Sequence, residues 1–155
     1  MKVRDLMTQS VASISSDDCL SSAARMMWEC DCGAIPVTRD GRVLGMITDR
    51  DICMASWIKN QPLSEISVAD SMSRELFSCS PDDNVSVAER LMQSRQIRRL
   101  PVLDREGRLV GILSLADIVR GSDRAGRGVS DVSSSEVAST LATICQPRST
   151  QRAFA

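Results

Sequence analysis

The 155-residue chain contains no histidine, and aromatic residues make up only 3% of it. Histidine is the side chain that enzymes use most often as a general acid or base, so its absence removes most familiar catalytic arrangements. The phosphate-binding P-loop, the Rossmann glycine pattern and the Gly-x-Ser-x-Gly nucleophile elbow are also absent from the sequence. With so few aromatic rings, the chain has little with which to stack the bases of single-stranded nucleic acid. These absences predict a protein that is not an enzyme.

Neither an excess of one charge nor a long apolar run is present. Lysine and arginine number 19 against 20 aspartate and glutamate residues. A protein that binds nucleic acid would carry a basic patch, and a membrane helix would need roughly 20 apolar residues. The first seven residues also lack the apolar core of a signal peptide. We therefore expect a cytoplasmic protein that partners neither nucleic acid nor a membrane.

The chain does contain six cysteines, most of them in apolar periodic segments where a reduced thiol packs like a small hydrophobic group. We expect them to fill the core and to hold no metal. Cys30 and Cys32 are the exception, because a C-x-C pair at the end of a helix can take part in a metal or redox site. A role for this pair stays open. The six are Cys19, Cys30, Cys32, Cys53, Cys79 and Cys145.

The sequence is a repeat. A shift of 65 residues aligns the two halves, and one inserted residue near Glu106 makes the shift 66 afterwards. Matches in this order, with one gap in a turn, indicate a duplicated module. The matched segments include Val3–Met7 with Val68–Met72, Pro36-Val37 with Pro101-Val102, Gly45 with Gly111, and Asp51-Ile52 with Asp117-Ile118.

Hydrophobic periodicity predicts the element order β-α-β-β-α in both copies. The predicted strands are 11–14, 34–38 and 42–48 in the first copy, and 76–79, 99–103 and 108–114 in the second. A short helix precedes each copy, over Val3–Met7 and Val68–Met72. One copy alone is too small to bury both its sheet face and its helices. We therefore expect an α+β fold in which the two repeats pack about a pseudo-two-fold axis, with ligand clefts between them.

A C-terminal extension follows the second repeat. Its first part is rich in Ser, Arg and Gly, which indicates a linker. The capping box from Ser133 to Glu136, followed by Val137, Leu141 and Ile144 at helical spacing, predicts one short amphipathic helix. Such a helix is unstable alone in water and should dock on its own module or on a dimer mate, ahead of a disordered tail. The resulting divisions are 1–60 and 61–121 for the repeats and 122–155 for the extension.

The polar chemistry of the repeat lies where the last strand meets the last helix. There, a hydroxyl residue precedes a carboxylate by three positions, and a helix that starts at the hydroxyl points both side chains the same way. The carboxylate suits sugar hydroxyls, and the free amides of the helix start suit a phosphate, so the corner suits a nucleotide. An ordinary helix cap would use the same residue types, and that alternative stays open. The two pairs are Thr48 with Asp51 and Ser114 with Asp117.

The duplicated pattern, an M-(x)-V-x-x-x-x-x-D segment, then P-V, then G-x-x-[ST]-x-x-D-I, resembles the CBS domain, named after cystathionine β-synthase. The tandem pair over residues 1 to about 121 resembles a Bateman module. Met46–Ile52 and Gln96–Val102 are typical of stand-alone bacterial CBS-pair proteins. The resemblance implies a regulatory or sensory module that binds AMP, ADP, ATP, NAD or S-adenosylmethionine and acts on a protein that the sequence does not identify.

The resemblance also implies roles for single residues. Asp51 and Asp117 would hold ribose hydroxyls, while Thr48 and Ser114 would face the phosphate. Adenine would lie between the first strand and the residues before P-V. This places Val11, Ala12, Ala34 and Ile35 at one base, and Leu76, Phe77, Arg99 and Leu100 at the other.

Arginines would assist with phosphate, since a guanidinium matches its geometry. Arg98 and Arg99 would serve the second site, and Arg50 the first. The alternative for Arg98 and Arg99 is a pair of solvated charges at a helix exit.

The motif helices carry more apolar residues than one core-facing stripe requires, which predicts an interface. The resemblance implies that this interface forms a disc-shaped homodimer. The alternative from a different class is a structural or interaction module without nucleotide, whose cysteines bind metal or respond to oxidation. The apolar residues concerned are Ile52, Cys53, Trp57, Ile58, Ile118 and Val119.

Overall fold

The computed structural model describes residues 1–125 and 134–147, which divide into two compact units. The first-repeat unit contains Gln9–Ser78 and Leu103–Gly111. The second-repeat unit contains Met1–Thr8, Cys79–Val102 and the chain from Ile112 onward. Each unit thus takes in residues that the sequence assigns to the other repeat.

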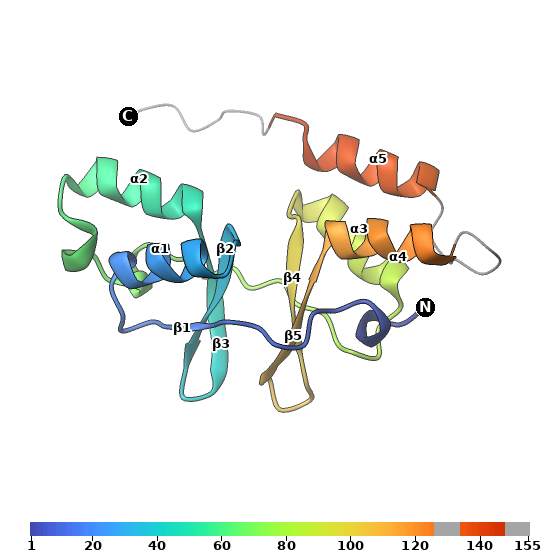
Figure 1. Ribbon diagram of the computed structural model, residues 1–155, viewed down its shortest axis with the longest axis horizontal. Coiled ribbons are helices and arrows are strands. Elements are labelled where there is room, and N and C mark those ends of the chain that lie inside the picture. Colours follow the sequence, from blue (N-terminus) through green and yellow to red (C-terminus); the bar gives the residue numbers. More distant parts are fainter. Residues whose placement is uncertain (126–133, 148–155) are drawn as a thin grey trace. The chain divides into compact units, whose positions relative to one another are not determined.

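The first-repeat unit is built on a three-stranded sheet (Figure 1). β1 (Ile14–Ser15) runs parallel to β2 (Ala34–Arg39), and β2 pairs antiparallel with β3 (Arg42–Thr48). Gly41, in the turn between β2 and β3, has a φ of 75°, which glycine adopts without strain. The helices of this unit are α1 (Leu20–Glu29), α2 (Asp49–Lys59) and two short 3-10 helices, Leu63–Glu65 and Val68–Asp70.

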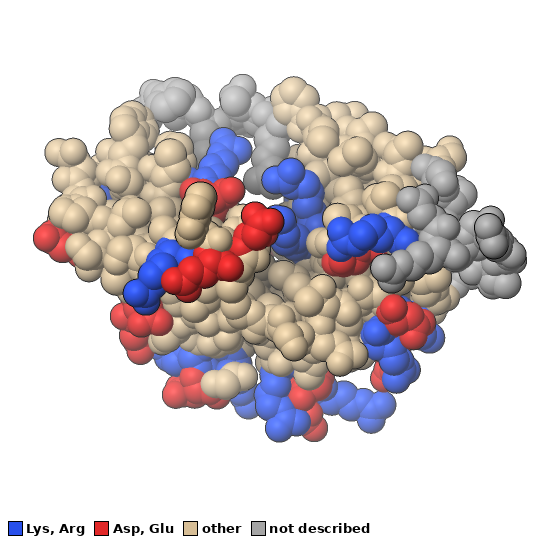
Figure 2. Space-filling model, in the orientation of Figure 1, with Lys and Arg blue, Asp and Glu red and all other residues tan. Residues whose placement is uncertain are grey.

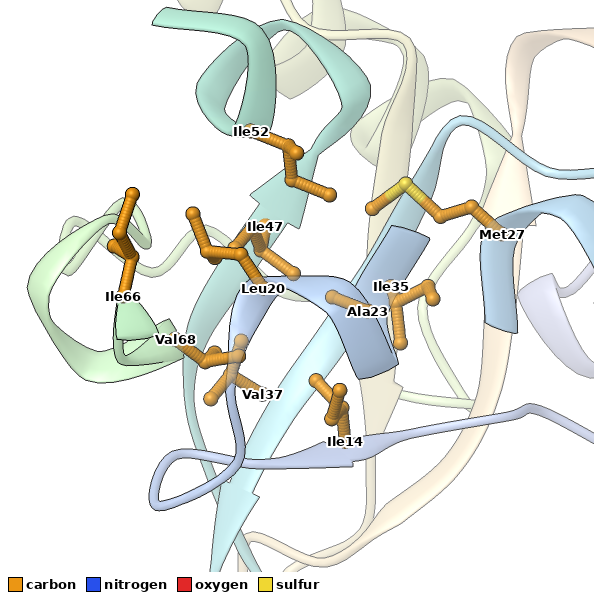
Figure 3. Packing of buried hydrophobic residues seen from close by; sticks show 10 residues of the cluster. All are labelled: Ile14, Leu20, Ala23, Met27, Ile35, Val37, Ile47, Ile52, Ile66 and Val68. Atoms are coloured by element: carbon orange, nitrogen blue, oxygen red, sulfur yellow. The ribbon is translucent and has the colours of Figure 1, made fainter. Parts of the chain in front are cut away.

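The core of this unit lies between the sheet and its helices (Figure 3). In α1, Leu20, Ala23 and Met27 follow helical spacing and are all buried. They meet alternate residues of the strands, and Ile52 of α2 closes the cluster from the motif helix. The ten core residues are Ile14, Leu20, Ala23, Met27, Ile35, Val37, Ile47, Ile52, Ile66 and Val68.

The second repeat has the same order of elements with less sheet. β4 (Arg99–Leu103) pairs with β5 (Leu109–Ser114). The strand predicted over 76–79 is reduced to one parallel bridge between Cys79 and Val102, and the strand predicted over 11–14 begins only at Ile14. The helices are the 3-10 turn Val3–Asp5, α3 (Val85–Arg95), α4 (Leu115–Ala125) and α5 (Ser134–Ile144).

The segment in front of each repeat packs into the other repeat's unit. In the second-repeat unit, the amide of Val3 donates to the carbonyl of Asp83 at 2.9 Å. In the first-repeat unit, the equivalent amide of Val68 donates to the carbonyl of Asp18, also at 2.9 Å. Both valines are fully buried. This exchange explains why the units cross the repeat boundary, and the predicted short helices at these positions are single 3-10 turns.

The expectation of core packing, which left Cys30 and Cys32 open, is wrong for Cys53 and Cys145. Cys79 is buried, and Cys19 and Cys32 are half-buried. Cys30, Cys53 and Cys145 are exposed, because Cys30 and Cys145 directly follow the ends of α1 and α5, and Cys53 lies on the outer face of α2.

The C-terminal helix α5 docks on its own module, as one of the two expected arrangements requires. It lies against α3 and α4 of the second-repeat unit (Figure 1). Val137 and Thr140 are buried, and Thr140 Oγ1 donates to Glu89 Oε1 at 2.8 Å. Glu89 is itself only 6% exposed. The linker was expected over 122–134, but residues 122–125 belong to α4 and Ser134 begins α5. Residues 126–133 and the expected tail, 148–155, lie outside the described residues.

The buried pair of Thr140 and Glu89 makes α5 docking testable. Thr140→Val keeps the side-chain shape but removes the donor to a buried carboxylate, so we expect the free energy of unfolding to fall by about 1–3 kcal/mol. Urea unfolding of the full chain measures this, with Ser139→Ala on the same helix as the control. The double variant Glu89→Leu/Thr140→Val should lose less, since neither polar group is left unpaired. Equal stability of Thr140→Val and Ser139→Ala would show that the contact is unimportant.

Candidate functional site

The first hydroxyl–carboxylate pair forms the corner between β3 and α2. Thr48 is the N-cap of α2, and its Oγ1 accepts from the Asp51 amide at 3.2 Å. In return, Asp51 Oδ2 accepts from the Thr48 amide at 2.9 Å and from Thr48 Oγ1 at 2.7 Å. This is a capping box, and it fixes both side chains at the helix start. Within the described chain, Asp51 Oδ1 accepts no hydrogen bond and remains available.

The second pair repeats this geometry between β5 and α4. Asp117 Oδ2 accepts from the Ser114 amide at 2.8 Å and from Ser114 Oγ at 2.6 Å. Ser114 Oγ accepts from the Asp117 amide at 3.2 Å. The structure therefore joins both predicted pairs in the predicted way, one in each unit.

Arg120 distinguishes the second pair from the first. Its guanidinium forms an ion pair with Asp117 Oδ1, the oxygen that the cap leaves unused. The repeat aligns Arg120 with Met54, which has no charge to offer Asp51. Arg120 was not among the site residues expected from the sequence, although an aspartate followed by an arginine three positions later on a helix is a recognisable signal.

The backbone amides at the helix starts are less free than expected. In α2, the amide of Asp49 donates to the carbonyl of Gly33 at 3.2 Å, and that of Arg50 to Asp49 Oδ1 at 2.7 Å. With the Asp51 amide bound to Thr48, the predicted anion-binding amides of the first pair are already used. In α4, the Ala116 amide lacks the carboxylate that accepts from the Arg50 amide, because Leu115 stands where Asp49 does. The second pair therefore keeps one donor for an anion.

The residues before P-V are hydrogen-bonded through their backbone to the starts of α2 and α4. The amide of Leu115 donates to the carbonyl of Arg98 at 2.9 Å, as the amide of Asp49 does to Gly33. Arg98 is exposed and Arg99 is half-buried. Leu100 is fully buried, and Ile35 lies in the core cluster. The side chains of Leu100 and Ile35 face the core, so only the backbone of these two residues could contact a base as expected.

The remaining predicted residues all belong to the first-repeat unit. Val11 and Ala12 are half-buried in front of β1, and Ala34 begins β2. Arg50 is exposed on the first turn of α2. Leu76 and Phe77 are half-buried in this unit, whereas Ser114 and Asp117 lie in the other, so their place at a second base stays a prediction.

The two corners differ in charge. The first has two carboxylates, Asp49 and Asp51, with Arg50 as its cation. A Cβ on Gly33 would lie 2.9 Å from Asp49 Oδ2. The carboxylate of Asp49 therefore lies against the backbone of Gly33, just before β2. The second corner has Asp117 paired with the guanidinium of Arg120, and the backbone carbonyl of Arg98 is bonded to the start of α4. Over the whole face seen in Figure 2, acidic and basic side chains are interspersed, so this contrast is local.

Metal and membrane sites find no support in the described residues. No group of three or more His, Cys, Asp or Glu side chains in this part of the chain could hold a metal ion. No helix within it is long and apolar enough to cross a membrane. An activated thiol lies outside the C-x-C pair, at Cys19. Hydrogen bonds with the hydroxyls of Ser21 and Ser22 lower the pKa of Cys19 to about 7.

Cysteine labelling tests this difference among the thiols. Burial raises the pKa of Cys79 to about 12, so we expect iodoacetamide at pH 7 to modify Cys19 early and Cys79 last. Because its pKa is lowered, the Cys19 rate should rise with pH only to just above 7 and then level off. Mass spectrometry of the labelled peptides measures both rates. Ser21→Ala should move the rise to higher pH, and an unchanged profile would contradict the assigned cause.

Comparison with protein families gives one match, to the CBS domain. The family model matches residues 3–57 and again 63–123. Among curated proteins, the chain is similar to the CBS domain-containing protein YhcV of Bacillus subtilis. The two are 37% identical over 134 residues, which is 84% of this chain and 94% of YhcV.

Two solved structures share the fold and carry ligands. CBSX2 in complex with AMP superposes with a TM-score of 0.72 at 27% identity, over 81% of this chain and 98% of CBSX2. The CBS domain pair of MJ0100 in complex with 5'-methylthioadenosine and S-adenosyl-L-methionine gives a TM-score of 0.70 at 25% identity, over 77% of this chain and 98% of that pair.

Proposed function

The chain belongs to the CBS-domain family, and from that premise we propose that it is a stand-alone regulatory module that binds an adenine nucleotide at each hydroxyl–carboxylate corner. One observation carries the proposal: both repeats hold the same pair in the same capping geometry at the start of the same helix. The ligands of CBSX2 and MJ0100 support it, because AMP, methylthioadenosine and S-adenosylmethionine all contain adenosine.

In this proposal, the carboxylates of Asp51 and Asp117 accept hydrogen bonds from the ribose hydroxyls. Ribose offers two neighbouring hydroxyl donors, and a carboxylate is the strongest acceptor for them. Asp51 Oδ1 is available for this contact at the first corner. At the second corner, the ribose has to displace Arg120 from Asp117 Oδ1 or share that oxygen with it. Thr48 and Ser114 hold the carboxylates in place, since each hydroxyl donates to the Oδ2 atom of its aspartate.

The corners should prefer different ligands. Arg98, Arg99 and the free Ala116 amide favour a ligand with several phosphates at the second corner. At the first corner, Asp49 and Asp51 repel phosphate, and the amides of α2 are already used. We therefore assign AMP or an uncharged adenosyl compound to the first corner and ADP or ATP to the second.

Regulation follows from binding alone in this proposal, because the module supplies no reaction chemistry. A ligand can act only by binding one arrangement of the module more tightly than another. The regulated partner is a protein of the same compartment, which we take to be the cytoplasm.

Calorimetric titration of AMP and ATP tests the proposal. Asp51→Asn and Asp117→Asn keep an oxygen for the capping hydrogen bonds but remove the charge that holds the ribose. A hydrogen bond to a charged group contributes about 1.5–3 kcal/mol, so each variant should weaken its own site about tenfold or more. Asp51→Asn should act mainly on AMP, and Asp117→Asn mainly on ATP.

Asp49→Asn is the matched control for the first corner. It removes a neighbouring charge without touching the proposed ribose contact, so it should not weaken AMP binding. If Asp51→Asn and Asp117→Asn both left the isotherms unchanged, or if wild-type protein took up neither nucleotide, the proposal would be wrong. The alternative, a structural or interaction module that binds no nucleotide, would then be the better hypothesis.

A further inference from the structure

The two motif aspartates differ in what binds their second carboxylate oxygen. In the second repeat, Ser114 uses Asp117 Oδ2 for the cap, and the guanidinium of Arg120 donates to Asp117 Oδ1. In the first repeat, Thr48 uses Asp51 Oδ2 in the same way, but no described residue donates to Asp51 Oδ1. The carboxylate proposed to bind ribose is therefore open in the first repeat and occupied in the second.

Arg120 can leave this contact without disturbing the rest of the corner. Its side chain is 62% exposed, whereas that of Asp117 is only 10% exposed. The carboxylate of Asp117 is held by the amide and the hydroxyl of Ser114. Leu115 and Ile118 anchor the same helical turn, since both are buried. The guanidinium is thus the movable member of the pair, and the carboxylate keeps its position when the guanidinium leaves.

The ion pair also places the guanidinium where a phosphate is favoured. Side chains of an α-helix point toward its N-terminus, so Arg120 reaches back to the first turn of α4. A helix start attracts anions through its partial positive charge. A guanidinium binds phosphate with two parallel hydrogen bonds, as it binds a carboxylate. A phosphate at the start of α4 therefore competes with Asp117 for Arg120.

We propose that the ion pair between Arg120 and Asp117 is a latch on the second corner, which the phosphate of a bound nucleotide opens. The guanidinium transfers its hydrogen bonds from Asp117 Oδ1 to the phosphate, and this oxygen is then free to accept from the ribose hydroxyls. An adenosyl compound without phosphate gives Arg120 no new partner, so it has to compete with the latch for the carboxylate. Arg120 thereby makes the second corner select phosphorylated ligands.

The first repeat lacks this latch. The repeat aligns Arg120 with Met54, whose side chain carries no charge. Arg50 is exposed in the first turn of α2, and its guanidinium forms no ion pair within the described part of the chain. The first corner can therefore accept an adenosyl ligand that carries no phosphate. This inference rests on the proposed function and adds the residue that sets the ligand preference of the second corner.

Arg120→Met gives the second corner the residue of the first and so removes the latch. The substitution is made in the full chain carrying Asp51→Asn, which weakens the first corner so that titrations report the second. Adenosine should bind about fivefold more tightly without the latch, a change that an exposed ion pair can account for. ATP should bind more weakly by a similar factor, because its phosphates lose a guanidinium. Calorimetric titration of adenosine and ATP measures both changes.

Two further variants serve as controls in the same Asp51→Asn chain. Arg105→Met removes the same charge from the turn between β4 and β5, at the opposite end of β5 from Ser114, and should change neither affinity. Arg120→Lys keeps a cation for Asp117 and should keep adenosine binding weak. Opposite changes for adenosine and ATP distinguish a latch from a structural role, which would move both affinities in the same direction. Far-UV circular dichroism confirms that each variant is folded.

Met54→Arg is the reciprocal substitution, which installs a latch at the first corner. Met54 is exposed and follows Asp51 by three residues on α2, as Arg120 follows Asp117 on α4. In a chain carrying Asp117→Asn, this variant should bind adenosine about fivefold more weakly than the same chain with Met54. An unchanged adenosine affinity would contradict the proposal.

The titrations separate failure of the latch from failure of the proposed function. If Arg120→Met changed neither affinity, or moved both in the same direction, while Asp117→Asn still weakened ATP binding, the latch would be wrong and the proposed function would stand. If Asp117→Asn altered the binding of neither ligand, the ribose contact would be wrong and the latch with it.

Discussion

The capping hydrogen bonds between Asp51 and Thr48, and between Asp117 and Ser114, are the interaction on which the candidate sites depend. Each one closes the corner where the last strand of a repeat becomes its last helix, and so fixes a carboxylate at a helix start. The capping alternative and the binding hypothesis therefore do not exclude each other. A single oxygen of each carboxylate makes the cap, which leaves the other oxygen of Asp51 available and that of Asp117 paired with Arg120.

Duplication gave this protein two corners with one geometry, and substitution made their surroundings different. Arg120 pairs with Asp117 at the second corner, while the first has the two carboxylates Asp49 and Asp51. The outer helix faces differ in the same way. Glu89 and Gln93 of α3 form hydrogen bonds with α5 in the second repeat, whereas the repeat aligns them with Ala24 and the exposed Trp28 in the first. Differences between the copies therefore indicate function as strongly as their similarity does.

Much of the fold could be predicted from the sequence, because helix and hairpin signals are local. The repeat, the motif helices and the docking of α5 follow from periodicity, caps and burial needs. The strand expected over 76–79 does not form, and the exchange of Val3 and Val68 between units was missed, because both depend on tertiary pairing. At the sites, the hydroxyl–carboxylate pairs were predictable from their spacing. The use of the α2 amides by Gly33 and Asp49, and the burial of Leu100, were not, because they depend on packing across elements.

The central claim is that the two carboxylates recognise the ribose of an adenine nucleotide. The most direct test compares AMP and ATP with their 2'-deoxy and 2',3'-dideoxy analogues in binding to the wild-type protein. These analogues keep the base and the phosphates but lose one or both hydroxyl donors. We expect affinity to fall about tenfold or more when both hydroxyls are removed, because a charged acceptor loses its partners. Equal affinities for AMP and its dideoxy analogue, and for ATP and its own, would contradict the account.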